Sequence, residues 1–184
     1  MSSEIDALKV RMQGAITNLE KEFGGLRTGR ASVDLLNPVM VDAYGSKVPL
    51  NQVANVSTAD ARTLTVQVWD GSQVQAVEKG IINSGLGLNP NTEGQTIRIN
   101  LPELNSERRE ELVKVARKYA EEAKVSIRNV RRDGMDSLKK EKDAGEATED
   151  DVKIISDQIQ KLTDEFVGKI DSKLTQKEGD IRAV

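Results

Sequence analysis

The sequence LVKVARKYAEEAKVSIRNVRRDGMDSL, residues 112–138, decides the fold class. Its apolar residues recur every three or four positions, which is the spacing of one face of an α-helix. The members of this apolar stripe are Leu112, Ala116, Tyr119, Ala123, Ile127, Val130 and Leu138. Because the stripe is narrow and the other positions are mostly polar or charged, the helix needs partner helices to cover it. We expect a long helix that starts after Ser106, the N-cap, and belongs to a bundle.

Stripes of the same kind occur near both ends of the chain. The first comprises Ile5, Leu8, Met12, Ala15, Leu19, Phe23 and Leu26. A break follows the middle helix at KEKDAGEAT, where Gly145 ends one helix and Thr148 caps the next. The last stripe comprises Val152, Ile155, Ile159, Leu162, Phe166, Ile170 and Leu174. None of the three helices can bury its stripe alone, so we expect residues 1–30 and 105–184 to pack as one three-helix bundle.

Residues 31–104 carry the pattern of short strands instead. TLTVQVW (63–69) alternates apolar and polar residues, and so does TIRINLP (96–102), as half-buried strands do. PVMVDAYGSKVPL predicts short strands around a turn, QVQAVEKGIINSG a short helix, and GLGLNPNTEG a cluster of turns. This segment is expected to be an inserted α+β domain joined to the bundle by two hinge crossings. The hinge residues are Gly29, Arg30, Ala31, Ser32, Pro102, Glu103, Leu104 and Asn105.

The composition argues against several classes of protein. There is no cysteine and no histidine, which removes thiolate chemistry, the usual proton shuttle and the commonest metal ligand. GLGLNPNTEG lacks the ending of a phosphate-binding loop, and no base-and-nucleophile pair is apparent. No run approaches the ~18–20 apolar residues of a membrane span. We expect a soluble cytoplasmic protein with no catalytic residue, metal, cofactor or membrane contact, in which Trp69 packs against the protein rather than against a base.

Positive charge is concentrated in the middle helix. Residues 117–132 hold six basic and two acidic side chains, whereas residues 31–106 hold four basic and seven acidic ones. Arg117, Lys124, Arg128 and Arg131, here called the basic stripe, lie on one side of the predicted helix, away from its apolar stripe. Glu121 can pair with Lys124, but most of the basic stripe needs a partner helix or an external anion.

Three interpretations of the basic stripe stay open on this pattern. It can be a solvated helix face, an RNA-binding surface that contacts phosphates, or the docking surface of an adaptor for an acidic protein. Arginine suits RNA because its planar group bonds phosphate through two N–H groups. RNA competition and a log–log salt slope of about −0.7 to −0.9 per neutralised phosphate distinguish RNA from protein.

Several long motifs resemble the bacterial ribosome recycling factors. They are LRTGRAS (26–32), AVEKGIINSGLGLNPNTEG (76–94), SIRNVRRDG (126–134), EDD (149–151) and QKLTDEFVGKID (160–171). The resemblance extends in order over essentially the whole chain. It implies an α+β fold, with a long antiparallel three-helix bundle and a small, β-rich α/β domain inserted after the first helix. It also implies a translation factor that works with elongation factor G and GTP. Such a factor disassembles the post-termination ribosome and releases its subunits, mRNA and tRNA.

The resemblance further implies partners and sites. The bundle would bind 23S rRNA of the large ribosomal subunit, and the inserted domain would swing about the hinge to meet elongation factor G. The resemblance points to Arg128, Arg131, Arg132, Arg109 and Arg27 as RNA-binding residues, with Arg30 at the hinge end. The basic stripe adds Lys124 and Arg117 to this expected set. The expected contact with elongation factor G comprises Tyr44, Gly45, Ser46 and Lys47. We expect a monomer without enzymatic activity, since the GTP belongs to the partner. Gly134, just after the arginine cluster, is expected to reduce the local rigidity of the helix, because glycine costs a helix up to about 1 kcal/mol relative to alanine.

Overall fold

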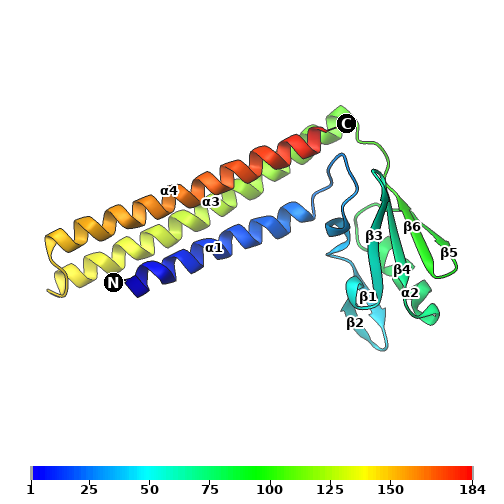
Figure 1. Ribbon diagram of the computed structural model, residues 1–184, viewed down its shortest axis with the longest axis horizontal. Coiled ribbons are helices and arrows are strands. Elements are labelled where there is room, and N and C mark those ends of the chain that lie inside the picture. Colours follow the sequence, from blue (N-terminus) through cyan, green and yellow to red (C-terminus); the bar gives the residue numbers. More distant parts are fainter. Residues whose placement is uncertain (1, 184) are drawn as a thin grey trace. The chain divides into compact units, whose positions relative to one another are not determined.

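The computed structural model describes residues 2–183, which form an α+β protein with three long helices and a small antiparallel sheet (Figure 1). The chain divides into two compact units. The first joins helix α1 (Ser2–Gly24), as far as Phe23, with residues Lys114–Glu178. The second joins Gly24–Val113 with the chain from Gly179 onward. The division at residues 30/31 and 104/105 that the sequence suggests remains a proposal.

The first unit is an antiparallel bundle of α1 with parts of α3 (Ser106–Asp143) and α4 (Glu149–Arg182) (Figure 1). Ion pairs tie α1 to both partners: Arg11 lies 2.8 Å from Asp133 on α3, and Glu20 lies 2.8 Å from Lys173 on α4. Among the buried side chains are Met12, Ile16, Leu19, Phe23, Ala116, Ala120, Ala123, Ile127, Val130, Leu138, Ile155, Ile159, Leu162, Phe166 and Ile170. Most members of the predicted apolar stripes therefore form the core, together with Ile16 and Ala120. Leu26 lies beyond the end of α1, and the half-buried members are Ile5, Leu8, Ala15, Tyr119, Val152 and Leu174.

The helix ends follow local hydrogen bonding. Gly145 adopts φ +75° after α3, and the Thr148 hydroxyl accepts a hydrogen bond from the Asp151 N–H at 3.1 Å. The Asp151 carboxylate accepts one from the Thr148 N–H at 3.0 Å, which completes a reciprocal capping box. Both predictions at this turn are confirmed. The expectation of Ser106 as N-cap is wrong, because Asn105 Oδ1 accepts from the Arg108 N–H at 2.7 Å and Ser106 is the first helical residue.

The second unit contains the sheet and its short helices. Its elements are η1 (Val33–Leu36), β1 (Met40–Ala43), β2 (Ser46–Pro49), η2 (Leu50–Gln52), β3 (Ala54–Asp60), β4 (Thr63–Val68), η3 (Gly71–Gln73), α2 (Val74–Ile82), β5 (Pro90–Glu93) and β6 (Thr96–Asn100). Strands β1 and β2 form a hairpin, and the larger sheet has the antiparallel order β3-β4-β6-β5. Strand β5 lies in the stretch where the sequence predicts only turns, with Pro90 as the first residue of an edge strand.

The alternating residues of the strands form the core of this unit as predicted. Leu64, Val66 and Val68 of β4 are buried with Ile97 and Ile99 of β6. Helix α2 packs closely on β1, because a Cβ added at Gly80 would lie 2.7 Å from the carbonyl oxygen of Met40. Within residues 2–183, none of the helices combines the length and the apolar character that crossing a membrane requires.

Candidate nucleic-acid interface

Three members of the basic stripe on α3 are bound to side chains of α4. Arg117 Nε donates to Glu178 Oε1 at 2.7 Å, Lys124 Nζ lies 2.5 Å from Asp171 Oδ1, and Arg131 Nε donates to Gln160 Oε1 at 2.8 Å. The three donors are spaced by seven residues, which returns to nearly the same side of a helix after two turns. Of the two alternatives that the sequence left for the basic stripe, a partner helix or an external anion, the partner helix accounts for these three side chains.

The members of the stripe differ in the charge that remains available. Lys124 is the most enclosed, with 15% of its side chain exposed, and it also lies 3.7 Å from Glu121, as the sequence predicted. Lys124 and Arg117 face carboxylates, so their charge is largely compensated. Arg131 bonds a neutral carboxamide, whose NH₂ group in turn donates to Asp164 at 2.9 Å, so the positive charge of Arg131 is only partly offset.

Arg128 and Arg132 differ from these three. Both side chains are exposed, and within residues 2–183 neither makes a hydrogen bond or an ion pair. They are four residues apart, and Lys114 and Lys118 lie on the same side of the helix, 18 and 14 residues before Arg132. We call Lys114, Lys118, Arg128 and Arg132 the cation face. The two lysines were not among the expected RNA-binding residues. Their spacing from Arg132, close to a whole number of helical turns, would have placed them on the same side of the helix.

A second group of arginines lies in the other compact unit, near the expected hinge. Arg27, Arg30, Arg62 and Arg109 line one pocket with two acidic side chains, Asp60 and Glu103. Arg27 donates to the carbonyl of Pro102, but its Nε and that of Arg109 are buried without a hydrogen-bond partner among the described residues. Burial, with Arg108 and Arg62 nearby, lowers the pKa of Arg27. A bound anion would reduce the repulsion between the arginines and would accept hydrogen bonds from the unpaired Nε groups.

The residues expected to form the hinge are held by several local interactions. The Gly29 N–H donates to the carbonyl of Asp180 at 3.1 Å, and a Cβ at Gly29 would collide with the carbonyl of Ala183. The Ala31 N–H donates to the carbonyl of Ala61 at 2.7 Å, and Ser32 Oγ accepts from the Asp34 N–H at 3.3 Å. In the other crossing, Leu104 is buried and Arg62 lies 3.8 Å from Glu103. Both crossings thus contact folded parts of the same compact unit.

The expected contact residues for elongation factor G occupy the β1–β2 turn. Tyr44 (φ +53°) and Gly45 (φ +82°) form its tip, as a two-residue hairpin turn requires. The Tyr44 hydroxyl donates to Asp70 Oδ2 at 2.6 Å, which fixes the exposed ring. This bond raises the pKa of Tyr44, and with the Ser72 N–H and hydroxyl it lowers the pKa of Asp70. Ser46 and Lys47 follow as exposed residues of β2.

The two arginine groups present hydrogen-bond donors that an anion could accept. Arg128 and Arg132 offer exposed guanidinium groups on a rigid helix, and the hinge pocket offers partly buried ones. Among residues 2–183, no group of three or more acidic side chains is placed to hold a metal ion. Phosphate oxygens are the acceptors that such arginine groups fit best.

Comparison with known proteins identifies close relatives over the full length. The family described as ribosome recycling factor matches this chain over residues 19–181. A ribosome-recycling factor from Xanthobacter autotrophicus is 59% identical over 181 residues, which covers 98% of this chain and 97% of that relative. One from Nitrobacter winogradskyi is 58% identical over 183 residues, covering 100% of this chain and 98% of that relative.

Solved structures agree with the sequence comparison. A solution structure of the ribosome recycling factor has a TM-score of 0.80 at 37% identity and covers 100% of this chain and 97% of that one. The T. thermophilus ribosome recycling factor, in a structure with E. coli elongation factor G and the E. coli post-termination complex, has a TM-score of 0.70 at 44% identity. That comparison covers 99% of this chain and 98% of that one. The chain therefore belongs to the ribosome recycling factor family.

Proposed function

We propose that the chain disassembles the ribosome complex that remains after termination, together with elongation factor G and GTP, and so frees subunits, mRNA and tRNA for new initiation. The observation that carries the proposal is the family match over residues 19–181, which includes both arginine groups. The T. thermophilus relative, whose structure includes elongation factor G and a post-termination complex, aligns with 99% of the chain, so its assembly is the appropriate template.

The 23S rRNA of the large subunit is the proposed ligand of the bundle. Arg128 and Arg132 make the first phosphate contacts, because they are exposed and have no partner within the described residues. Arg131 adds a third contact if it exchanges Gln160 for a phosphate oxygen. Lys124 and Arg117 contribute by positioning α3 on α4, and reach RNA only after releasing their carboxylates. Arg27 and Arg109 bind phosphate at the hinge end, where their unpaired Nε groups find an acceptor.

The inserted domain, residues 31–104, is proposed to swing about the two hinge crossings and to meet elongation factor G through Tyr44, Gly45, Ser46 and Lys47. The rigid tip of the β1–β2 turn supports this, because the Tyr44–Asp70 bond presents the aromatic ring in one orientation. The chain has no native cysteine, so two introduced cysteines can lock the crossings to each other. Loss of recycling in the oxidised form, with recovery on reduction, is the expected result, and full activity when locked would contradict the swing.

In this proposal the chain is a monomeric cytoplasmic factor that works through binding alone. Elongation factor G binds and hydrolyses the GTP, and the chain contributes the surface that destabilises the subunit interface. Because its proposed ligand is ribosomal RNA, the chain is proposed to act in the cytoplasm, where ribosomes translate.

Polysome breakdown tests the function. Puromycin-treated polysomes are incubated with the protein, elongation factor G and GTP and separated on a sucrose gradient, with parallel reactions that omit one component. Conversion to monosomes and subunits only when all components are present is expected. If polysomes persist although circular dichroism shows the native helices, the proposed function is wrong. Binding to an acidic protein without competition by RNA would then support an adaptor.

A further inference from the structure

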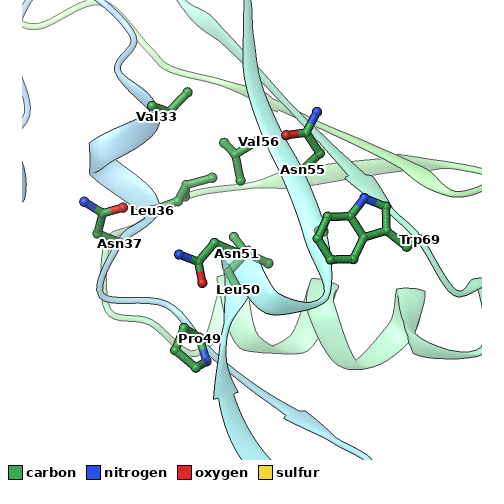
Figure 2. Close-up of a pocket in the computed structure, with 10 residues that line it drawn as sticks. Val33, Leu36, Asn37, Pro49, Leu50, Asn51, Asn55, Val56 and Trp69 are labelled. Atoms are coloured by element: carbon green, nitrogen blue, oxygen red, sulfur yellow. The ribbon is translucent and has the colours of Figure 1, made fainter.

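A small pocket in the second compact unit has no role in the proposed function. Its lining comes from η1, from the end of β2 with η2, and from the start of β3, together with Trp69 after β4. Figure 2 shows Val33, Leu36 and Asn37 on one side and Trp69 on the other, with Leu50 and Asn51 between them. All these elements belong to the same folded unit, so the pocket is a fixed feature of it.

The pocket has the size of a side-chain receptor. Its volume is about 240 Å³, which is below the range of roughly 300–1,000 Å³ for sites that enclose a small molecule. Leu36, Leu50 and Ala54 are buried in the core beneath it, whereas Val33 is 40% exposed. An apolar side chain of a partner that enters the pocket would therefore pack against residues of the domain core.

Trp69 gives the pocket an exposed aromatic wall. The sequence predicts that this residue packs against the protein rather than against a base, and in the structure it lines the pocket with 60% of its surface exposed. Its backbone is held firmly, since its N–H donates to the carbonyl of Val53 at 3.2 Å and its carbonyl accepts from Gln95. An exposed indole on a fixed backbone offers an apolar contact surface, and its ring face attracts Lys and Arg more strongly than other aromatic rings do.

The polar groups around the pocket suit a basic peptide. The carboxamides of Asn51 and Asn55 are exposed and make no hydrogen bond within residues 2–183, and a carboxamide can both donate to and accept from a peptide group. Asp34 and Asp70 directly adjoin lining residues in the sequence, and no Lys or Arg occupies such a position. The charged residues next to the lining in the sequence are thus acidic, and residues 31–106 hold seven acidic against four basic side chains, which complements lysine and arginine.

We propose that this pocket binds a basic peptide segment of a partner protein, in which one apolar side chain enters between Val33, Leu50 and Trp69. A neighbouring lysine or arginine of that segment lies over the indole of Trp69, near Asp34 or Asp70. The carboxamides of Asn51 and Asn55 bond its backbone. The pocket is thus a protein-docking site distinct from the arginine groups that are proposed to bind RNA, and it does not depend on that proposal.

Trp69 is the only tryptophan of the chain, so its fluorescence reports directly on the pocket. The full-length protein is titrated with a capped peptide in which one leucine is flanked by lysines. Parallel titrations use a peptide with alanine in place of the leucine and one with glutamates in place of the lysines. We expect a saturable shift of the emission with the first peptide, an affinity lower by about tenfold or more with the alanine peptide, and no response to the acidic one.

Two variants test the location. Val33→Lys adds charge and removes an apolar wall, and is expected to weaken binding of the leucine peptide by about tenfold or more. Met40→Lys is the matched control, because Met40 is similarly exposed (46%) in the same unit but does not line this pocket. Equal weakening by both variants would contradict the location, and circular dichroism with thermal melting verifies that both are folded.

Other outcomes would overturn the proposal. Equal binding of the leucine and alanine peptides would mean that charge alone attracts them. A fluorescence shift with a small apolar molecule but with no peptide would assign the pocket to a small ligand. A shift that appears when the protein alone is concentrated would assign it to a second copy of the chain. The absence of any response also contradicts the proposal.

Discussion

Lys124 on α3 and Asp171 on α4 form an ion pair of 2.5 Å, in which 15% of the lysine side chain is exposed. Arg128, one helical turn further along, has an exposed side chain and no partner within the described residues. Two members of the same basic stripe therefore have different tasks: one holds two helices together, and the other presents charge to the solvent.

Lys124→Gln and Arg128→Gln, which each remove one positive charge, should separate these tasks. We expect Lys124→Gln to lower the free energy of unfolding by about 1 kcal/mol, because it breaks a partly enclosed ion pair, and Arg128→Gln to change it by less than about 0.5 kcal/mol. Arg128→Gln should instead lower the salt slope of RNA binding by about one unit. Urea unfolding and filter binding at several salt concentrations measure the two effects. Equal losses of stability would contradict the distinction.

The second prediction concerns Gly134 and Leu8. A Cβ on Gly134 would lie 2.6 Å from Leu8 Cδ1 and 3.3 Å from Ile159 Cδ1, so glycine permits the close contact of three helices in the bundle. Alanine would favour the helix by up to about 1 kcal/mol but must displace Leu8. We expect Gly134→Ala to be more favourable in a Leu8→Ala background than in the native protein. A double-mutant cycle from urea unfolding gives the difference, and an interaction free energy near zero would contradict it.

The third prediction compares two glycines that differ in surroundings. Gly29→Ala places a methyl group against the backbone carbonyl of Ala183, whereas a Cβ on Gly14 in α1 meets no atom within 4 Å. We expect Gly29→Ala to loosen the chain end and to speed amide hydrogen exchange at residues 180–183. Gly14→Ala should raise the free energy of unfolding by up to about 1 kcal/mol. Unchanged exchange in Gly29→Ala would show that this contact does not anchor the end of the chain.

The fourth prediction is a pH effect at the β1–β2 turn. The Tyr44 hydroxyl is the main cause of the lowered pKa of Asp70, so Tyr44→Phe should raise that pKa toward its ordinary value. Because the folded pKa is depressed, the bond stabilises the native turn above the unfolded pKa of about 3.9 and loses its effect as the pH falls through the folded value.

Carboxylate NMR titration measures this pKa in the native protein and in the variant. Asp60 is the internal control, because its lowered pKa is caused chiefly by the Arg62 N–H and not by Tyr44. An unchanged Asp70, or an equal shift at Asp60, would contradict the assigned cause.

Much of the fold could be predicted because the sequence periods are clear. The alternation through Leu64, Val66 and Val68 predicts the buried face of β4, and the three apolar stripes predict the bundle. β5 was missed because Pro90 and its polar neighbours carry no strand pattern, and the strand forms only through pairing with β6. Asn105 was missed as a cap because Ser106 is an equally good capping residue in the sequence.

The site could be predicted in part. The charge of residues 117–132 indicates an anion-binding helix, but the sequence does not show which arginines are already occupied. That depends on α4, where Glu178, Asp171 and Gln160 come to face α3 only after the bundle has formed. Trp69 illustrates the same limit, because a residue at the end of a strand can face the core or the solvent.

The most direct test is polysome breakdown by a variant that lacks the two arginines of the cation face. Arg128→Gln/Arg132→Gln is compared with the native protein and with Lys153→Gln/Lys161→Gln, which removes two exposed charges from α4 instead. With elongation factor G and GTP, we predict that the native protein and the α4 control convert polysomes to monosomes and subunits, while the arginine variant is at least about tenfold less active. Full activity of a folded Arg128→Gln/Arg132→Gln protein would contradict the central claim that these two arginines bind the ribosome.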